Sequence, residues 1–178
     1  MSPGLTPSQT VGPYLHLGLC GCAWIGPLLA TPGSPGALRV QGRVLDGAGE
    51  PVADALVEVW QAGQDGSYLP SSGRFGRCDT RGDGRFAFVT VKPGPVAWPD
   101  GGTQAPHLEL GVFARGLLKR AVTRMYFPDE AAANDADPVL AGVDPDRRAT
   151  LVARPEPDGT LRFDIHLQGG DETVFFAL

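Results

Sequence analysis

The chain has 178 residues, a length that one domain with a single buried core accounts for. Its 20 acidic and 15 basic residues give a net charge of −5, and the basic residues form no cluster in the sequence, so we do not expect nucleic acid as a partner. Glycine and proline are abundant, with 25 and 17 residues, which predicts many turns between short strands.

Residues 1–37 are expected to form an extended arm. The arm contains no Asp, Glu, Lys or Arg and is rich in glycine and proline, so it should hardly fold by itself as a helix. We expect a segment so poor in charge to be buried, either against the core of its own domain or against another chain. Its apolar stretch 15–30 is interrupted by glycine and proline and follows no basic residue, which argues against a signal peptide or a membrane span.

The three cysteines do not predict a disulfide framework. Cys20 and Cys22 are two residues apart, too close to bridge comfortably in a strand, and Cys78 stands alone in the sequence. Free thiols fit a reducing compartment, so we expect the protein in the cytoplasm.

From residue 38 onward, apolar and polar residues alternate with period two, which predicts short strands. Val40 and Val44 share one side of the first strand, and Val57 and Val59 share one side of the second. The predicted strands are 38–46, 55–62, 85–91, 107–114, 122–127, 149–154 and 162–168. Turn residues separate them, and only a short helix is expected, at 129–135. The pattern predicts an all-β fold, an antiparallel β-sandwich over residues 38–178.

The predicted strand 107–114 begins with two residues of metal-ligand type. His107 and Glu109 lie on one face of it, where they could hold a metal ion from one side or simply form a polar strand face. Adding His166 gives the facial triad of ferrous oxygenases. However, no Lys or Arg follows His166 to hold a 2-oxoglutarate acid group, so the triad is an alternative only.

Two further residues are candidates for a site. Tyr68 follows a strand and a turn, where a phenol could ligate a metal or cap the core. Arg115, just past the end of a predicted strand, could be a solvated charge or could bind a carboxylate. The sequence contains no phosphate-binding loop, no dinucleotide-binding glycine motif and no serine-hydrolase order.

Several segments, taken in order, resemble the intradiol ring-cleaving dioxygenases. They are TPSQTVGPY, VQGRVLDGAGEPVADALVEVWQAGQDGSY, FGRCDT, TVKPGPVAW, APHLELGVFARG, TRMYFPDEAAANDADPVL and RFDIHLQGGDETVFF. The resemblance spans nearly the whole chain, and it implies a β-sandwich from a family that opens aromatic rings with O2 at a ferric ion.

The resemblance also implies where iron would bind. Catalytic chains of the family hold Fe(III) with two tyrosines and two histidines, and the matching positions here are Tyr68, Val96, His107 and Glu109. Valine cannot coordinate a metal, and a single phenolate does not balance the ferric charge. We therefore expect no metal and no catalytic residue in this chain.

Heteromeric members of the family combine an iron-binding beta chain with an alpha chain that lacks iron, and the VFARG and GDETVFF segments match the alpha pattern. The resemblance implies a homologous iron-binding beta chain as partner, a higher-order alpha–beta oligomer, and 3,4-dihydroxybenzoate and O2 as substrates. It also implies that Thr10, Pro13 and Arg115 reach the substrate pocket. Taken alone, Thr10 could also be a turn former, Pro13 a loop stiffener and Arg115 a surface charge, and of the three we favour the pocket role for Arg115.

Two features leave other interpretations open. The compact segment GLCGCAWIGPLLATPGSPG replaces a longer polar insertion of the alpha chains, which alters the contacts of the arm. The segment VQGRVLDGAGEPVADALVEVW also fits a non-enzymatic β-sandwich module of the carboxypeptidase-regulatory type. Such a module predicts a stable monomer, and it has no need of SQTVGPY or FARG.

Overall fold

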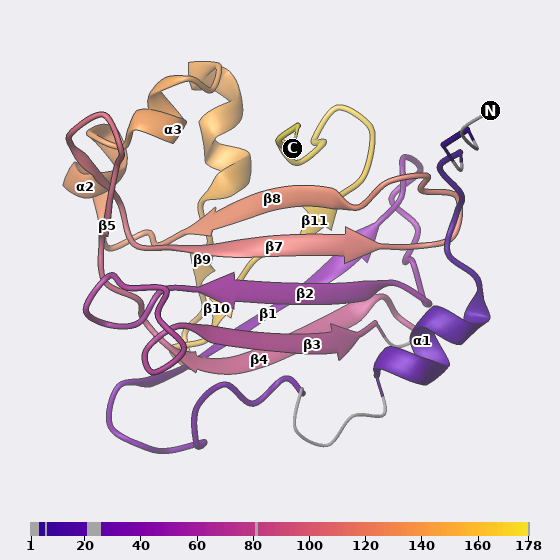
Figure 1. The fold of residues 1–178 in the computed structure, drawn as a ribbon, viewed down its shortest axis with the longest axis horizontal. Coiled ribbons are helices and arrows are strands. Elements are labelled where there is room, and N and C mark those ends of the chain that lie inside the picture. Colours follow the sequence, from indigo (N-terminus) through magenta and orange to yellow (C-terminus); the bar gives the residue numbers. More distant parts are fainter. Residues whose placement is uncertain (1–3, 6, 21–25, 81, 178) are drawn as a thin grey trace.

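Two main β-sheets stack face to face in the computed structural model, which describes residues 4–5, 7–20, 26–80 and 82–177 (Figure 1). The elements are α1 (Pro13–Leu19), β1 (Ala37–Leu45), β2 (Leu56–Gln61), β3 (Arg74–Asp79), β4 (Arg85–Val91), β5 (Val96–Ala97), β6 (Thr103–Gln104), β7 (His107–Phe113), β8 (Ala121–Tyr126), α2 (Ala131–Asp135), α3 (Pro138–Ala141), the 3-10 helix η1 (Pro145–Leu151), β9 (Arg154–Pro155), β10 (Leu161–Arg162) and β11 (Ile165–His166).

The first sheet is built around β1. This strand pairs antiparallel with β4 from Ala37↔Val91 to Arg43↔Arg85, and it pairs parallel with β10 and β11 on its other side. The second sheet has the order β3-β2-β7-β8, with every pairing antiparallel. β5 and β6 form a separate hairpin. The expected antiparallel sandwich is confirmed, with two short parallel pairings added at β1.

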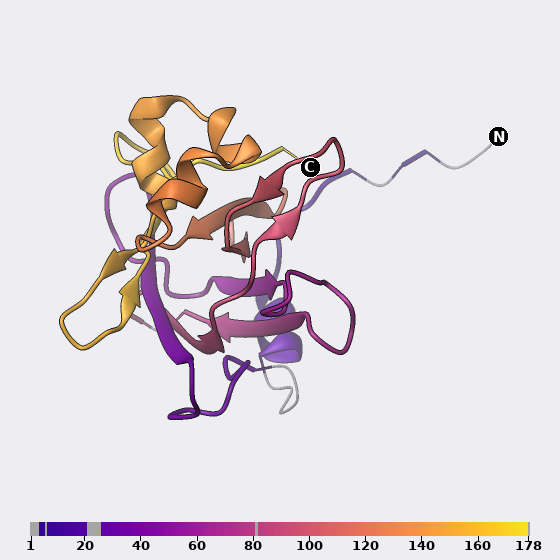
Figure 2. The same ribbon diagram turned by 90° about the vertical axis from the view of Figure 1, so that its left-hand side faces the viewer.

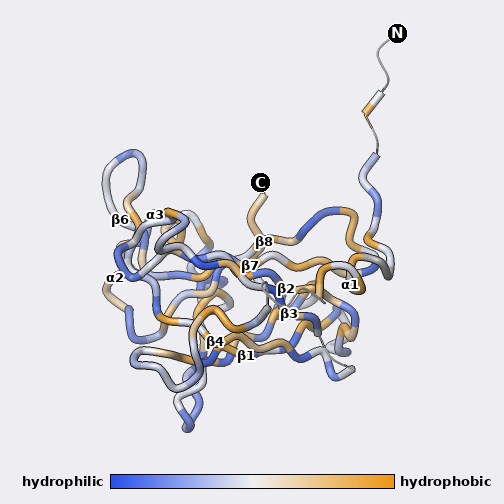
Figure 3. Tube along the Cα trace, turned by 60° about the horizontal axis from the view of Figure 1, so that its bottom comes forward, coloured by the Kyte–Doolittle hydropathy of each residue, from blue (hydrophilic) through white to orange (hydrophobic). Residues whose placement is uncertain are grey.

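Apolar side chains from both sheets meet between them. The first sheet contributes Val40, Val44, Phe86, Phe88 and Ile165, and the second contributes Val57, Val59, Leu108, Leu110, Val112 and Met125. Hydrophobic stretches accordingly run along strands of both sheets (Figure 3). Each such buried side chain stabilises the fold by about 1.5–3 kcal/mol relative to an exposed one. The period-two alternation therefore identified the inner faces correctly.

The predicted strands near the C-terminus are partly wrong. Residues 145–151 form η1 instead of a strand, because the Asp144 side chain accepts a hydrogen bond from the Asp146 backbone N–H and Pro145 occupies the first helical turn. The segment 162–168 divides into β10 and β11. It divides where Asp164 Oδ1 accepts the Arg43 backbone N–H at 3.0 Å, so a side chain replaces the ladder bond.

The arm contains a helix, and another part of it packs on the sandwich. Residues 13–19 form the helix α1, although the glycine and proline content of the arm argued against a helix. Proline at position 13 is compatible with it, because proline suits the first position of a helix. Farther along, the Val89 N–H donates to the Pro27 carbonyl at 2.9 Å, the Leu29 N–H donates to the Val89 carbonyl at 2.8 Å, and Leu29 is buried in the core. This part of the arm covers its own domain, whereas the first described residues project away from the sandwich (Figure 2).

The helices α2 and α3 lie at one end of the sandwich (Figure 1). The short helix expected at 129–135 is found as α2, and α3 follows it. Asp137 caps α3, because its buried carboxylate accepts the backbone N–H groups of Val139 at 2.8 Å and Leu140 at 2.9 Å. Within the described residues, no helix is long and apolar enough to cross a membrane.

Candidate functional site

The four positions that match iron ligands gather at the end of the sandwich where β7 begins. His107 and Glu109 lie on β7, and Val96 lies on β5, which pairs with β6 beside it. The loop that carries Tyr68 packs against β5, because a side chain at Gly66 (φ +75°) would collide with the backbone next to Val96. The four positions therefore lie at the same end of the fold.

His107 is held rigidly within this cluster. Its side chain is buried, and its ring lies 5.8 Å from the ring of Tyr126. Its Nδ1 lies 2.7 Å from the Ala105 carbonyl oxygen, which only accepts, so Nδ1 donates a hydrogen bond to it. The other nitrogen, Nε2, faces Glu109 Oε1 at 3.7 Å. His107 is thus more deeply buried than a polar strand face would be.

Glu109 is paired with an arginine that the sequence analysis did not single out. Arg124 lies directly opposite Glu109 in the pairing of β7 with β8, and Arg124 Nη2 is 2.7 Å from Glu109 Oε1. Arg124 Nη1 also donates to Gln104 Oε1 at 2.7 Å. The side chains of Arg124 and Glu109 are 14% and 28% exposed, so their ion pair is largely sheltered from water. The guanidinium charge lies among the positions that match iron ligands.

The neighbouring charges set the protonation of this pair. Burial alone would raise the pKa of Glu109, but the His107 imidazole and the Arg124 guanidinium outweigh it, and the pKa lies below the ordinary value. Burial alone would lower the pKa of Arg124, but its contacts with Tyr126 and Glu109 raise it. Glu109 is therefore a carboxylate and Arg124 a cation at neutral pH.

Tyr68 completes the cluster as a neutral phenol. Its ring stacks on Trp60, with centroids 6.0 Å apart and planes 5° apart. Burial, and then the charge of Glu109, raise the pKa of Tyr68 to about 12, although Arg124 opposes the shift. A metal-bound tyrosine must lose its proton, so these surroundings disfavour the form that a ligand needs.

The residues present do not fit a ferric ion. Val96 has no donor atom, and the Glu109 carboxylate is engaged by Arg124. A fixed guanidinium charge at this position repels a metal cation. No three His, Cys, Asp or Glu residues in the described part of the chain are placed to hold a metal ion. The positions that match iron ligands are thus grouped as in a metal centre, but the positive charge among them is the guanidinium of Arg124.

The facial-triad alternative is wrong. His166 lies on β11 in the sheet around β1, whereas His107 and Glu109 lie on β7 in the other sheet. The His166 backbone N–H donates to Thr173 Oγ1 at 3.0 Å, and its carbonyl accepts the Thr173 N–H at 2.9 Å. These bonds tie His166 to the C-terminal segment and not to the other two residues.

The remaining candidates lie at the opposite end of β7, toward α1 and the N-terminal segment (Figure 1). The Arg115 side chain, 74% exposed, forms an ion pair with Asp54. Thr10 Oγ1 accepts the backbone N–H of Gly116 at 2.8 Å, so the arm and the Arg115 loop are in contact. The side chain of Pro13 lies outside the part of the structure that is described.

The chain matches the family model described as Dioxygenase over residues 30–169. It is 44% identical over 193 aligned positions to the protocatechuate 3,4-dioxygenase alpha chain of Burkholderia cepacia, with 96% of each chain covered. It is 36% identical over 154 positions to the beta chain from the same organism, covering 75% of this chain and 65% of that one. The dioxygenase domain of a carbohydrate-binding fusion protein from Streptomyces sp. SirexAA-E superposes with a TM-score of 0.63 at 27% identity, covering 93% of this chain and 100% of that one. The chain therefore belongs to the intradiol dioxygenase family.

Proposed function

We propose that this chain is the alpha chain of a protocatechuate 3,4-dioxygenase and acts together with a homologous beta chain that holds the iron. The complex inserts both atoms of O2 between the two hydroxyl-bearing carbons of 3,4-dihydroxybenzoate and yields 3-carboxy-cis,cis-muconate. The similarity to an alpha chain along 96% of both sequences supports this assignment, as does the more distant similarity to a beta chain.

One observation supports the assignment of the iron to the partner chain. The cluster that would hold iron contains Val96 in place of a donor, and it contains Glu109 bound to Arg124. Members of this family use iron, so the iron of the complex belongs to the partner. The chain studied here then contributes walls of the substrate pocket and contacts for assembly.

The position of Arg115 supports a role in a pocket that another chain completes. The strand β7 separates Arg115 from His107, and seven extended residues span about 20 Å. Arg115 therefore cannot serve the iron-like cluster of its own chain. Leu118 in the same loop is an exposed apolar side chain, as is Leu17 on α1, and both would gain from burial against a partner.

Arg115 is suited to bind the carboxylate of an aromatic acid. A guanidinium presents two parallel N–H donors to a carboxylate, and the ion pair with Asp54 holds the Arg115 side chain in place. The bond from Gly116 to Thr10 fixes the arm beside this loop. We propose that Thr10 and Pro13 line the same pocket, with Arg115 as the charged contact.

The role of Arg115 is tested in the complex co-expressed with an iron-binding beta chain. Arg115→Ala should leave the assembled mass unchanged and raise the KM for 3,4-dihydroxybenzoate, with a loss of about 1–3 kcal/mol as for a charged hydrogen bond. Arg154→Ala, which removes an exposed arginine on β9, is the matched control and should leave KM unchanged. An unaltered KM for Arg115→Ala would remove Arg115 from the pocket.

The assignment of the iron is tested by metal analysis of each purified chain. The chain alone should contain no stoichiometric iron, should show no visible tyrosinate-to-iron absorption band and should not cleave the ring. One iron per chain, together with such a band and activity without any partner, would overturn the proposal. A stable monomer that binds no beta chain would instead point to the non-enzymatic sandwich module.

A further inference from the structure

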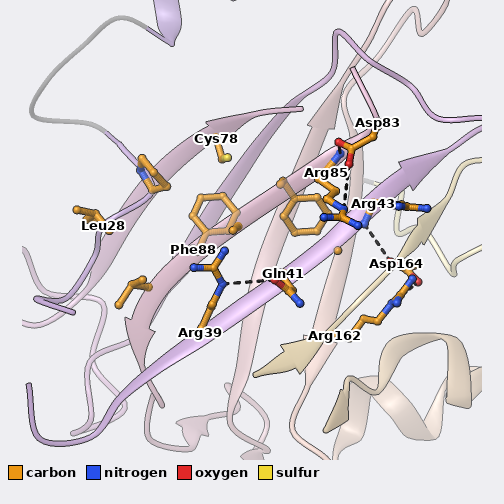
Figure 4. A pocket seen from close by; sticks show the side chains of 15 residues that line it. Leu28, Arg39, Gln41, Arg43, Cys78, Asp83, Arg85, Phe88, Arg162 and Asp164 are labelled. Atoms are coloured by element: carbon orange, nitrogen blue, oxygen red, sulfur yellow. Dashed lines mark hydrogen bonds and ion pairs between the residues drawn. The ribbon is translucent and has the colours of Figure 1, made fainter. Parts of the chain in front are cut away.

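A hollow on the outside of the sheet around β1 collects arginines from three strands (Figure 4). Its volume is about 690 Å³, and its basic lining residues are Arg39 and Arg43 of β1, Arg85 of β4 and Arg162 of β10. Asp83 and Asp164 are the acidic residues among those that line it. The hollow is therefore a local region of positive charge on a chain whose net charge is −5.

The strand register explains how the arginines surround the hollow. Gln41 of β1 lies opposite Ala87 of β4 and beside Arg162 of β10. Arg39 and Arg43 are two residues away from Gln41 along β1, on the same face and about 7 Å to either side. The small side chain of Ala87 leaves the space open, and the guanidinium groups border it (Figure 4).

The folded chain retains this arrangement in spite of repulsion. Arg43 and Arg85 lie directly opposite each other in an antiparallel pair, where like charges are destabilising. Asp83 pairs with Arg85 at 3.0 Å and Asp164 pairs with Arg162 at 2.9 Å, so each carboxylate engages one arginine. Exposed pairs of this kind offset little of the repulsion. The cluster thus makes no evident contribution to the stability of the sheet.

Two of the guanidinium groups, those of Arg39 and Arg43, form no ion pair within the described residues, although Asp158 interacts with Arg39 over a longer distance. Within the described residues, no carboxylate lies at ion-pair distance from the guanidinium of Arg39 or Arg43. Arg39 Nε donates to the neutral Gln41 Oε1 at 3.4 Å. These two groups can accept a negatively charged ligand without first giving up an acidic partner.

One side of the hollow is apolar. Pro27 and Leu28 of the arm lie along it next to Val89 of β4, and Leu28 is largely exposed. The Val89 N–H donates to the Pro27 carbonyl at 2.9 Å, so this wall is fixed to the sheet. The hollow therefore combines a cationic end with an apolar side, which a bare inorganic anion would not use.

We propose that this groove binds a small organic polyanion, a molecule with two or more carboxylate groups on a short hydrocarbon body. The planar guanidinium fork matches the carboxylate, and Arg43 lies about 5–7 Å across the strands from Arg85 and Arg162, a spacing that matches carboxylates separated by a few carbon atoms. Asp83 and Asp164 balance two of the four arginine charges. A ligand with one negative charge therefore gains little binding free energy, and a ligand with several gains more. The volume lies within the range of small-molecule sites. The proposal is independent of the ring-cleaving function.

The test is isothermal titration of the full chain with citrate and with benzoate at the same ionic strength. Citrate should bind one site per chain with a dissociation constant below about 1 mM. Benzoate should bind at least ten times more weakly, and added salt should weaken the binding of citrate. Equal affinity for the two acids, or no binding of citrate, would refute the proposal.

Variants decide whether the binding occurs in the groove. The double variant Arg43→Gln/Arg162→Gln should reduce the affinity for citrate at least tenfold, whereas Arg120→Gln, an exposed arginine after β7 on the other sheet, should not. Arg43→Gln relieves the repulsion with Arg85, so thermal unfolding should show no loss of stability for that change. Unchanged affinity in the double variant would sink the proposal. So would citrate binding to the free chain but not to the alpha–beta complex, because a partner surface then fills the groove.

Discussion

Replacing Arg124 by methionine tests whether its charge holds the iron-like cluster together. The substitution Arg124→Met keeps most of the length and apolar character of the side chain but removes the cation beside Glu109. It also removes the donor to Gln104 Oε1, which lies at 2.7 Å. Glu109 is then left as a sheltered carboxylate without its main partner.

The size of the effect follows from the burial of the pair. Removing one member of a fully buried ion pair costs about 3–5 kcal/mol. Here Arg124 is 14% exposed and Glu109 28% exposed, so water partly solvates the remaining carboxylate. We therefore expect Arg124→Met to lower the free energy of unfolding by about 2 kcal/mol, as for a charged hydrogen bond. Urea denaturation of the purified chain measures this value.

A double-mutant cycle separates the ion pair from simple packing. Glu109→Gln should cost less than Arg124→Met, and the double variant should be more stable than the sum of the single changes predicts, by about 1–2 kcal/mol. Strict additivity of the two changes would refute the interpretation of Arg124 as the charge partner of Glu109.

The pH dependence gives an independent check of the same pair. The pKa of Glu109 in the folded chain lies below its ordinary value of 4.5, so the folded state binds fewer protons than the unfolded state. The stabilisation is therefore fully present above pH 4.5 and is lost as the pH falls through the folded pKa. The difference in stability between the native chain and Glu109→Gln should accordingly shrink below pH 4.5. A difference that is constant from pH 7 to pH 3 would contradict this assignment.

Three other changes test the packing and the donor set. Gly42→Ala should cost more than about 3 kcal/mol or prevent folding, because its methyl group would collide with a backbone carbonyl of the neighbouring segment; a soluble variant with native stability would contradict the packing. In a spectrophotometric titration, the native chain should show a phenol that ionises near pH 12 and that Tyr68→Phe removes; ionisation near pH 10 would argue against its burial. The double variant Val96→Tyr/Glu109→His should bind no ferric ion while Arg124 remains. Adding Arg124→Met to it should produce a ferric complex with a visible tyrosinate-to-iron absorption band. The same band in the double variant would show that the guanidinium does not block the metal.

Strands with strict alternation could be predicted because one face of each is buried in the core. The edge strand β3 could not, since its described side chains are mostly half-exposed and only Gly76 is buried. A side chain at Gly76 would collide with Leu29, so this glycine leaves room for the arm. That contact joins residues far apart in the sequence, and no local pattern announces it.

The site was predictable up to the point where the pairing of strands decides it. The positions of Val96 and Glu109 follow from the resemblance, and the structure brings them together with Tyr68 and His107. The partner of Glu109 depends on the register of β7 against β8, which places Arg124 opposite it. A shift of one residue would have turned that side chain to the other face. Arg124 therefore could not be found from spacing alone.

A single carboxylate also ties the helical end of the molecule to the sandwich. Asp137 accepts hydrogen bonds from the Ala105 backbone N–H at 2.7 Å and from the Tyr126 hydroxyl at 3.2 Å, besides capping α3. A short helix that ends in solvent frays independently of the body of a protein. Here the amides at the start of α3 should exchange with deuterium only when the core opens. A helix of four residues should therefore exchange its amide hydrogens as slowly as a central strand does.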